Sequence, residues 1–321
     1  MKKLISVSLI LVLILSLFAG CGKADDCVYR IAIVQQMDHA SLDEIRLAIE
    51  AELDAKAVEL GITIEYKVFN GQNDTTVLNP IGAQVVSDGY DAIIPIATLA
   101  AQCMVNAPDG TDIPVIYAAV SDPEGSGLTG LPSVTGTSDA LNTSFILDMM
   151  RTATPGVKTV GLLYSNSEPN SELPIQQAKE YLDAHNIAYL EKTGNTTDEI
   201  ITAASSLVGR VDAVFTPTDN VVMGAEGAVA EILNEAGIPH YAGADSFVLS
   251  GAFATCGVNY TELGTYTAAM AVEVLRSGKV PAYHVMEGGI ITVNSVTAAT
   301  LGLDYSVFSA MANTVKEVTG E

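Results

Sequence analysis

Short apolar runs alternate with amphipathic stretches along most of the chain. Residues 31–34 form a continuous apolar run, which is typical of a strand buried on both faces of a sheet. Apolar residues at helical spacing follow over 42–60 and stop at Gly61, and Ser41 with Glu44 fits a capping box at the start of this pattern. These residues predict a strand followed by a helix.

The same alternation continues through the rest of the chain. Further apolar runs cover 92–97, 115–119, 159–164 and 213–216, and helical patterns cover 142–153 and 221–236. Alternating strands and helices are typical of an α/β protein with parallel sheets. Pro95 lies inside one of the runs, which is unusual for a central strand because proline has no N–H to donate.

A weak internal repeat divides the folded part into two. The segment 91–95 resembles 212–217, and the strand at Ile31 has its counterpart near Thr159. The offset between the copies is nearly constant, which indicates two lobes of one architecture. The length of 321 residues is sufficient for two domains of ordinary size.

The N-terminus has the pattern of a secretory signal. Lys2 and Lys3 precede an apolar run over 4–19, and small residues lead directly into Cys21. The run is also long enough for a retained membrane anchor, but its abrupt small-residue ending at a cysteine favours cleavage.

This segment resembles the lipobox of bacterial lipoproteins, with Phe18 where that pattern usually has Leu. The resemblance implies that 1–20 is a signal peptide and that Cys21 is lipidated, for example with palmitate. Residues 21–27 would then tether the protein to the extracytoplasmic face of the cell membrane.

The chain is strongly acidic, with a formal net charge of −23. A polyanion such as nucleic acid, or an acidic lipid surface, would be repelled by such a protein. We therefore exclude nucleic acid as a partner.

The cysteines show no CxxC or metal-ligand spacing, and no cofactor or metal is predicted. Besides Cys21 and Cys27, the chain has Cys103 and Cys256 in predicted folded segments. Export would permit a disulfide between these two. Two separately buried thiols are the preferred interpretation.

The segments that follow the predicted strands are rich in hydroxyls, amides and carboxylates. Ligands of open α/β sheets bind beyond the carboxyl ends of the strands. Such side chains suit a small zwitterion, and a sugar or nucleoside would fit too. Each residue also has a structural alternative: Asp219 could cap the following helix, and Glu168 could be a solvated loop residue.

Catalytic motifs are few in this sequence. Its four histidines occur without HExxH, and no GxSxG or Walker loop is present. Residues 125–130 fit GxGxxG but precede Leu-Pro-Ser instead of a helix, so we interpret them as a loop. The chain is therefore predicted not to be an enzyme. The alternatives are a secreted hydrolase that uses His39 or a Glu168–Asp219 pair, and a sensory ectodomain.

Six ordered segments carry a family signature: Thr-Leu-Ala-Ala-Gln (98–102), Ser-Asp-Pro (121–123), Gly-Thr-Ser-Asp (136–139), the loop 164–171, Pro-Thr-Asp-Asn (217–220) and Tyr-Thr-Glu-Leu-Gly (260–264). Together they resemble the ABC-transporter substrate-binding proteins of the tryptophan/tyrosine-uptake type. The resemblance implies two Rossmann-like lobes with parallel sheets, a type I periplasmic-binding-protein-like fold, and an interlobe cleft that closes on a solute by hinge motion.

The resemblance also implies the lobe boundaries, the partners and the site. Lobe 1 would comprise 28–138 with 258–287, and lobe 2 would comprise 139–257 with 288–321. The partners would be an amino acid, possibly aromatic, and the subunits of an ABC permease. The implied ligand-binding residues are Thr98, Asp139, Asn166, Glu168, Asn170, Ser171, Asp219 and Asn220, with Gln36, His39 and Asp245 as further candidates.

Overall fold

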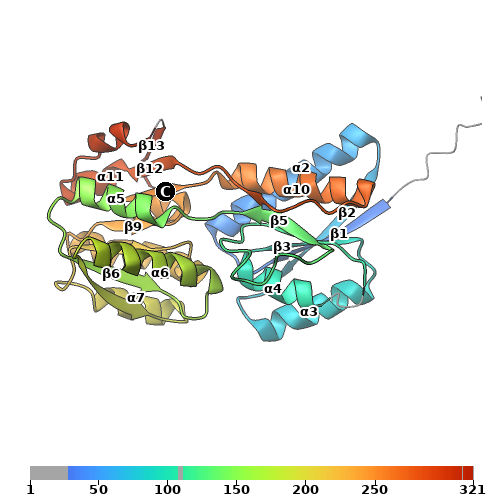
Figure 1. Cartoon of the computed structure of the whole chain (residues 1–321), viewed down its shortest axis with the longest axis horizontal. Helices are drawn as coiled ribbons and strands as arrows, with labels where there is room; N and C mark the ends of the chain where they lie inside the picture. The colour runs from blue at the N-terminus through green and yellow to red at the C-terminus, as the bar shows by residue number, and fades with distance from the viewer. Residues whose placement is uncertain (1–27, 108–110, 313, 321) are drawn as a thin grey trace, which may run out of the picture.

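The protein consists of two α/β lobes that lie end to end along its long axis (Figure 1). The computed structural model describes residues 28–107, 111–312 and 314–320. The predicted signal peptide, Cys21 and the tether lie outside these described residues. Within the described ranges, no helix combines the length and the apolar character needed to cross a bilayer.

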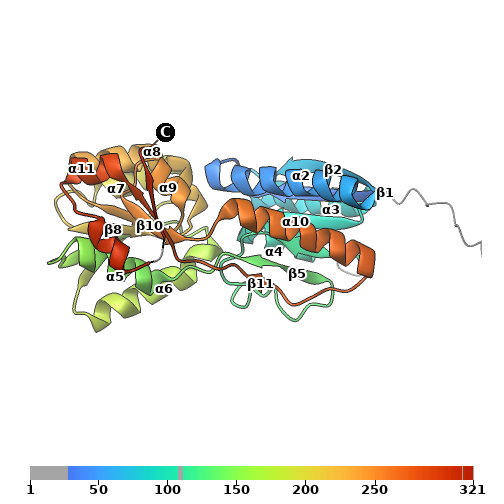
Figure 2. The same cartoon turned by 90° about the horizontal axis from the view of Figure 1, so that it is seen from above.

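Lobe 1 is built on a six-stranded sheet with the order β11-β5-β4-β3-β1-β2. All of its strand pairs are parallel. The strands are β1 (Val28–Gln35), β2 (Thr63–Asn70), β3 (Ala92–Ile96), β4 (Val115–Tyr117), β5 (Val134–Ser138) and β11 (His284–Val285). Helices α2 (Ala40–Leu60) and α10 (Tyr260–Ser277) cover one face, and α3 (Thr75–Ser87) and α4 (Thr98–Asn106) cover the other (Figures 1 and 2).

Lobe 2 is built on a seven-stranded sheet with the order β13-β12-β10-β9-β8-β6-β7. Only the β10–β12 pair of this sheet is antiparallel among the described strands. The strands are β6 (Thr159–Tyr164), β7 (Ala188–Thr193), β8 (Ala213–Thr216), β9 (His240–Ala242), β10 (Ala254–Gly257), β12 (Ile290–Asn294) and β13 (Val315–Val318).

The helices of lobe 2 also cover both faces of its sheet. Helices α5 (Thr143–Ala153) and α6 (Pro169–Ala184) share one apolar core, and α7 (Thr197–Ser205) and α8 (Asn220–Glu235) contribute to another. The remaining elements are the short helices α9 (Asp245–Leu249), α11 (Ser295–Leu301) and η1 (Ser306–Ala310). The predicted α/β class is therefore confirmed.

The internal repeat places an aspartate at the same structural position in each lobe. Asp91 of lobe 1 accepts a hydrogen bond from Arg30 N through Oδ2 (2.7 Å), at the start of the lobe's first strand. Asp212 of lobe 2 accepts hydrogen bonds from Lys158 N (2.8 Å) and Thr159 N (2.9 Å), also at the start of the first strand. The repeated aspartates thus fix equivalent strand pairs in the two lobes.

Pro95 lies in the central strand β3, at a place where few backbone hydrogen bonds join β3 to β4. Its carbonyl accepts a hydrogen bond from Ala118 N (2.8 Å), so its backbone polar groups face β4. Pairing between β3 and β4 is limited to Ile93 with Val115 and an isolated bridge between Ile96 and Ala118. The N–H that Pro95 lacks therefore falls between these two pairings, where β3 has no other pairing with β4.

Helix α2 forms as predicted and ends at Gly61, but the capping-box prediction is wrong. The N-cap position is His39, which makes no side-chain cap. The Ser41 hydroxyl instead contacts Ser246. Glu44 accepts hydrogen bonds from Thr261 N (3.0 Å) and Thr261 Oγ1 (2.6 Å) because α10 begins beside it. Tertiary packing has replaced the local cap.

The chain passes between the lobes in three segments. They follow β5, join β10 to α10, and join β11 to β12. Cys103 lies in lobe 1 and Cys256 in lobe 2, and both are buried free thiols. The preferred interpretation of two separate thiols is therefore confirmed.

Candidate functional site

Each lobe has a topological switch point, and the two switch points contribute to the interlobe cleft. In both sheets the first strand of the lobe lies between the second and the third, as β2-β1-β3 and as β7-β6-β8. Ligands of such sheets bind at the carboxyl ends of the two strands that flank the switch point. Gln36 and Thr98 follow β1 and β3, and Ser165 and Asp219 follow β6 and β8.

Between the lobes lies a cavity of about 20 Å³. Its lining includes polar residues from both lobes, namely His39, Ser41, Ser121, Asp139, Asn170, Thr218, Asp219 and Asn220. The rest of the lining is mainly apolar, namely Leu42, Ala97, Ala119, Met223, Ala244, Phe247 and Tyr260. This volume holds about one water molecule, whereas small-molecule sites enclose about 300–1,000 Å³. The lobes are therefore closed on each other.

Side-chain hydrogen bonds hold the cleft closed. They join Gln36 Nε2 to Glu168 Oε1 (3.0 Å), His39 Nε2 to Asn220 Oδ1 (3.0 Å), Ser121 Oγ to Thr218 Oγ1 (3.2 Å), and the hydroxyls of Ser41 and Ser246. Apolar contacts are also continuous from one lobe to the other, since Leu42 and Phe247 belong to one buried cluster.

Two buried carboxylates, Glu168 and Asp219, lie on the lobe 2 side of the cleft. Glu168 accepts hydrogen bonds from Gln36 Nε2 and from Asn220 Nδ2 (2.6 Å). Burial and the nearby charge of Asp219 raise the pKa of Glu168 to about 8. The solvated-loop alternative for this residue is therefore wrong, because its side chain is only 1% exposed.

Asp219 occupies the N-cap position of α8 and also connects that helix to the loop after β6. Its carboxylate accepts hydrogen bonds from Val222 N (2.9 Å), Ser165 N (2.7 Å) and Ser171 Oγ (2.7 Å). Burial raises its pKa. None of the salt bridges within the described residues includes Asp219 or Glu168. The cleft therefore holds two buried carboxyl groups that pair with no side-chain cation.

A third buried carboxylate, Asp139, lies where the chain first leaves lobe 1. It accepts hydrogen bonds from Ser121 Oγ (2.9 Å) and Tyr260 OH (3.0 Å). Burial raises its pKa. Since Asp139 and Tyr260 belong to different crossing segments, their bond joins these segments beside the cavity.

Several polar atoms at the cleft are buried and lack a hydrogen-bond partner among the described residues. They include His39 Nδ1, Thr98 Oγ1 and Asn170 Oδ1. Asn170 uses its other side-chain group to donate to Thr218 O (2.6 Å). Burial lowers the pKa of His39, which favours the neutral imidazole. An unpaired buried polar group costs about 1–3 kcal/mol, so these atoms are candidates for ligand contacts.

The backbone is strained where two loops of lobe 1 reach the cavity. Ala97 has φ 77° and Ala119 has φ 56°, a region that non-glycine residues seldom adopt. Both alanines line the cavity. Such strain is commonly retained at functional sites.

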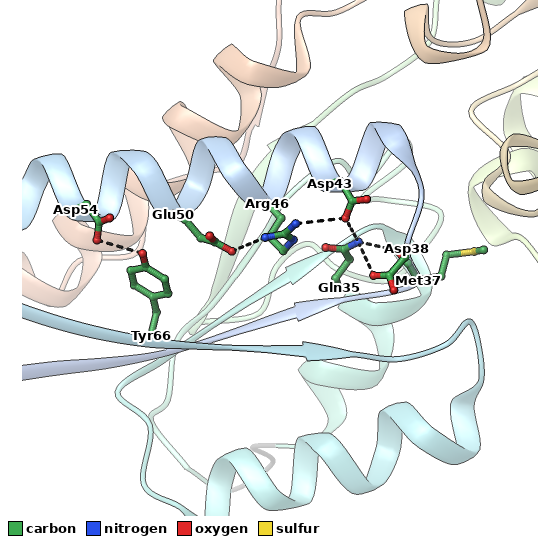
Figure 3. A network of polar contacts seen from close by, with 8 residues as sticks. All are labelled: Gln35, Met37, Asp38, Asp43, Arg46, Glu50, Asp54 and Tyr66. Atoms are coloured by element: carbon green, nitrogen blue, oxygen red, sulfur yellow. Dashed lines mark hydrogen bonds and ion pairs between the residues drawn. The ribbon is translucent and has the colours of Figure 1, made fainter. Parts of the chain in front are cut away.

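The loop from β1 to α2 is held from behind by a network of polar contacts (Figure 3). Gln35 Nε2 donates to Met37 O (2.8 Å) and Asp43 Oδ1 (3.0 Å). Arg46 then pairs with Asp43 (3.5 Å) and Glu50 (2.7 Å) along α2. The network fixes the backbone that carries Gln36 and His39 into the cleft.

The helix N-terminus of α4 is also directed at this loop. Leu99 N donates to the Gln36 side-chain oxygen (3.1 Å). The positive end of the helix dipole therefore lies at the cleft, beside the unpaired hydroxyl of Thr98.

The structure brings most of the predicted site residues together but leaves two apart. His39, Asp139, Asn170, Asp219 and Asn220 line the cavity. The residues Gln36, Thr98, Glu168 and Ser171 are buried around it.

Asn166 is exposed and bonds to Thr193 Oγ1 (3.1 Å), at a separate groove between β6 and α6. Asp245 forms a salt bridge with Lys316 (3.7 Å) and does not line the cavity.

Sequence reasoning missed the apolar part of the lining. Met223, Phe247 and Leu42 lie on helices whose periodicity indicates only that they are buried. No local signal separates a core residue from a cleft residue on such a face. The described residues contain no group of three or more His, Cys, Asp or Glu that could hold a metal ion.

The chain belongs to the family of ABC transporter substrate-binding proteins, whose family model matches residues 30–314. It is therefore an extracytoplasmic solute-binding protein and not an enzyme, and the hydrolase alternative is wrong. A tyrosine-binding protein of Clostridioides difficile (strain R20291) is 33% identical, over 94% of this chain and 93% of that protein.

Two solved structures are similar over nearly the whole chain. An ABC domain in complex with L-Trp from Streptococcus pneumonia is 29% identical with a TM-score of 0.83, covering 90% of this chain and 100% of that one. The ligand-free, open structure of a substrate-binding protein with adhesive properties from Clostridium difficile is 32% identical with a TM-score of 0.67, covering 91% and 100%. The lower score against an open structure agrees with the closed cleft seen here.

Proposed function

We propose that this chain is the substrate-binding lipoprotein of an ABC importer, which captures an aromatic α-amino acid between its lobes and delivers it to a membrane permease. The observation that carries the proposal is the pair of buried carboxylates, Glu168 and Asp219, which lie at the cleft without a salt bridge in the described structure. A ligand ammonium would supply the missing positive charge.

The other groups of the cleft match the remaining parts of an amino acid. The N-terminus of α4 and the Thr98 hydroxyl suit a carboxylate. The apolar lining around Phe247 and Met223 suits an apolar side chain. The similarity to proteins that bind tyrosine and tryptophan supports an aromatic side chain on the ligand. The proposed ligand contacts are His39, Thr98, Asp139, Asn170, Asp219 and Asn220, with Gln36, Glu168 and Ser171 supporting them.

Ligand entry requires the lobes to separate, because the closed cavity of about 20 Å³ is too small for an amino acid. The three crossing segments are the proposed hinge. The hinge would divide the chain into lobe 1 (28–138 with 258–287) and lobe 2 (139–257 with 288–321). Binding energy then comes from contacts that both lobes make with one ligand.

A lipid on Cys21 would keep the receptor beside its permease. Acyl chains contribute about 0.8 kcal/mol per buried methylene group, and two chains anchor a protein stably. The strongly acidic chain, with its net charge of −23, would not remain on an acidic membrane surface without such an anchor. Replacing Cys21 by Ser is expected to release the protein into the soluble fraction.

Mass spectrometry of the solute that copurifies with the native protein tests the proposed ligand class. We expect tyrosine or tryptophan in a one-to-one complex. A sugar or a nucleoside in their place would overturn the proposed ligand, although not the membership of the family.

A further inference from the structure

Two serines face each other across the cleft beside the cavity: Ser41 lines it, and Ser246 is the sequence neighbour of the lining residue Phe247. Ser41 lies in the first turn of α2, and Ser246 lies in α9. Each is followed in the sequence by an apolar residue of the lining, Leu42 in lobe 1 and Phe247 in lobe 2. The serines are only 4% and 3% exposed, so their hydroxyls are shielded from bulk water.

The two hydroxyls bond to each other and have capacity for a further partner. Each serine hydroxyl offers one donor and two acceptor sites. The Ser41–Ser246 bond uses one donor and one acceptor site. Within the described residues, the hydrogen bonds of these two side chains include no other contact. One buried O–H is thus left without an acceptor.

The surroundings of this pair differ from those of the other polar contacts in the cleft. Ser121 and Thr218 also meet across the lobes, but Ser121 donates to the Asp139 carboxylate. The hydroxyls of Ser41 and Ser246 bond to no carboxylate among the described residues, and Leu42 and Phe247 of the cavity lining follow them in the sequence. The two hydroxyls form a neutral polar group beside the apolar part of the lining.

The position of Phe247 in this wall is fixed from behind. Its ring packs edge-on against His240, with the ring centroids 6.4 Å apart. His240 is held in turn by Glu226 (3.0 Å) and Thr216 (2.9 Å). Ser246 therefore projects from a rigid support.

We propose that Ser41 and Ser246 are the specificity-determining residues of the cavity and bind a hydroxyl group on the ligand side chain. A phenol both donates and accepts a hydrogen bond. Placed between the serines, it donates to one oxygen and accepts the O–H of the other, which joins the lobes through the ligand. Phenylalanine leaves both serines without this partner, so the cavity prefers tyrosine.

This inference rests on the proposed function, because it requires an aromatic amino acid in the cleft. The test is isothermal titration calorimetry of the mature protein with L-tyrosine and with L-phenylalanine. The variants are Ser41→Ala and Ser246→Ala, one from each lobe. The matched control is Ser205→Ala, whose exposed hydroxyl bonds only to Ile201 O (2.9 Å) on the outside of α7.

We expect the unaltered protein to bind tyrosine at least about tenfold more tightly than phenylalanine, which corresponds to a net hydrogen bond or more. Each serine variant should lose about tenfold in tyrosine affinity while its phenylalanine affinity changes less than about twofold. Ser205→Ala should behave as the unaltered protein.

Equal losses for tyrosine and phenylalanine would show that the serines only help the lobes to close, and unchanged tyrosine affinity would show that they contribute nothing. Either result overturns the inference and leaves the proposed function standing. If the unaltered protein binds neither of these two amino acids nor L-tryptophan, the proposed function itself fails; if it binds L-tryptophan alone, only the inference fails, so the two failures are distinguishable.

Discussion

Gln36 donates a hydrogen bond from Nε2 to Oε1 of Glu168 over 3.0 Å, and this bond joins the end of β1 in lobe 1 to the start of α6 in lobe 2. The oxygen of the same amide accepts Leu99 N (3.1 Å), from the N-terminus of α4. One side chain thus connects both strands of the lobe 1 switch point to the buried carboxylate of lobe 2. Closure of the cleft therefore brings the helix N-terminus of one lobe close to the buried carboxyl group of the other.

Asp219→Asn should weaken amino-acid binding by about 10- to 100-fold, because a hydrogen bond to a charged group contributes about 1.5–3 kcal/mol. Asparagine keeps the size of the side chain and an acceptor oxygen for the α8 cap, but it removes the charge. Calorimetric affinity is the measurement. Asp74→Asn is the matched control, since Asp74 also caps a helix (Thr76 N, 2.7 Å) but lies outside the cavity. Near-normal affinity in Asp219→Asn would contradict an ammonium site.

Ligand affinity should rise with pH between about 6 and 8. The pKa of Glu168 is about 8, because of burial and the charge of Asp219, so its carboxyl group holds a proton in the folded protein at neutral pH. An ammonium binds the ionised form and displaces this proton, which gives up to about tenfold in affinity per pH unit. Calorimetry in buffers of different ionisation enthalpy would detect the released proton. Glu168→Gln should flatten the profile, and a flat profile in the unaltered protein would contradict the role given to Glu168.

The stability of the ligand-free protein should show the opposite pH dependence. The pKa of Glu168 rises on folding from an ordinary value of 4.5 to about 8, so the folded state binds the proton more tightly. Its contribution to the free energy of unfolding is complete below pH 4.5 and is lost as the pH rises through 8. The thermal midpoint should therefore fall from pH 6 to pH 8, and it should fall less in Glu168→Gln. An identical decline in both proteins would assign the effect to other groups.

Gly243→Ala should impair binding by displacing the loop that carries Thr218 and Asp219. A Cβ at this position would lie 2.6 Å from Thr218 N and 2.7 Å from Pro217 C, which are backbone atoms that cannot move independently. We expect a loss of affinity of tenfold or more. Gly227→Ala is the control, because its Cβ meets nothing within 4 Å on α8 and should stabilise the protein by up to about 1 kcal/mol. Equal binding by the two variants would contradict the tight approach of β9 to this loop.

Glu226→Ala should lower the free energy of unfolding by about 3–5 kcal/mol, the usual cost of breaking a buried ion pair or hydrogen-bonded equivalent. A hydrogen bond of 3.0 Å joins Glu226 Oε1 to His240 Nδ1, and both side chains are fully buried. Glu231→Ala on the exposed face of the same helix should change it by less than about 0.5 kcal/mol. Urea unfolding measures both. A small effect at Glu226 would mean that the pair is not the support of Phe247.

The strands and the lobes follow from features that lie close together in the sequence. Apolar runs such as 31–34 and 159–164 are typical of strands in a sheet covered on both faces, and the repeated aspartates at 91 and 212 mark equivalent strands. The polar side of the cleft was also predictable, because Asp219 and Glu168 follow strands that end at the switch point.

Other features depend on contacts between segments far apart in the sequence. Ser41 meets Ser246 instead of capping α2, and Glu44 binds the start of α10. Asn166 and Glu168 are two residues apart in one polar loop, yet one is exposed and the other is buried in the cleft. The difference in exposure arises from the path of the loop into α6, and the pattern of residues in the sequence does not predict that path.

The most direct test of the central claim is calorimetric titration of the mature protein, stripped of bound solute, with tyrosine and tryptophan and with a sugar and a nucleoside in parallel. An aromatic α-amino acid should bind with one-to-one stoichiometry, and Asp219→Asn should weaken that binding. Binding of the sugar or the nucleoside without the amino acids, or amino-acid binding that is unaffected by Asp219→Asn, would contradict the account.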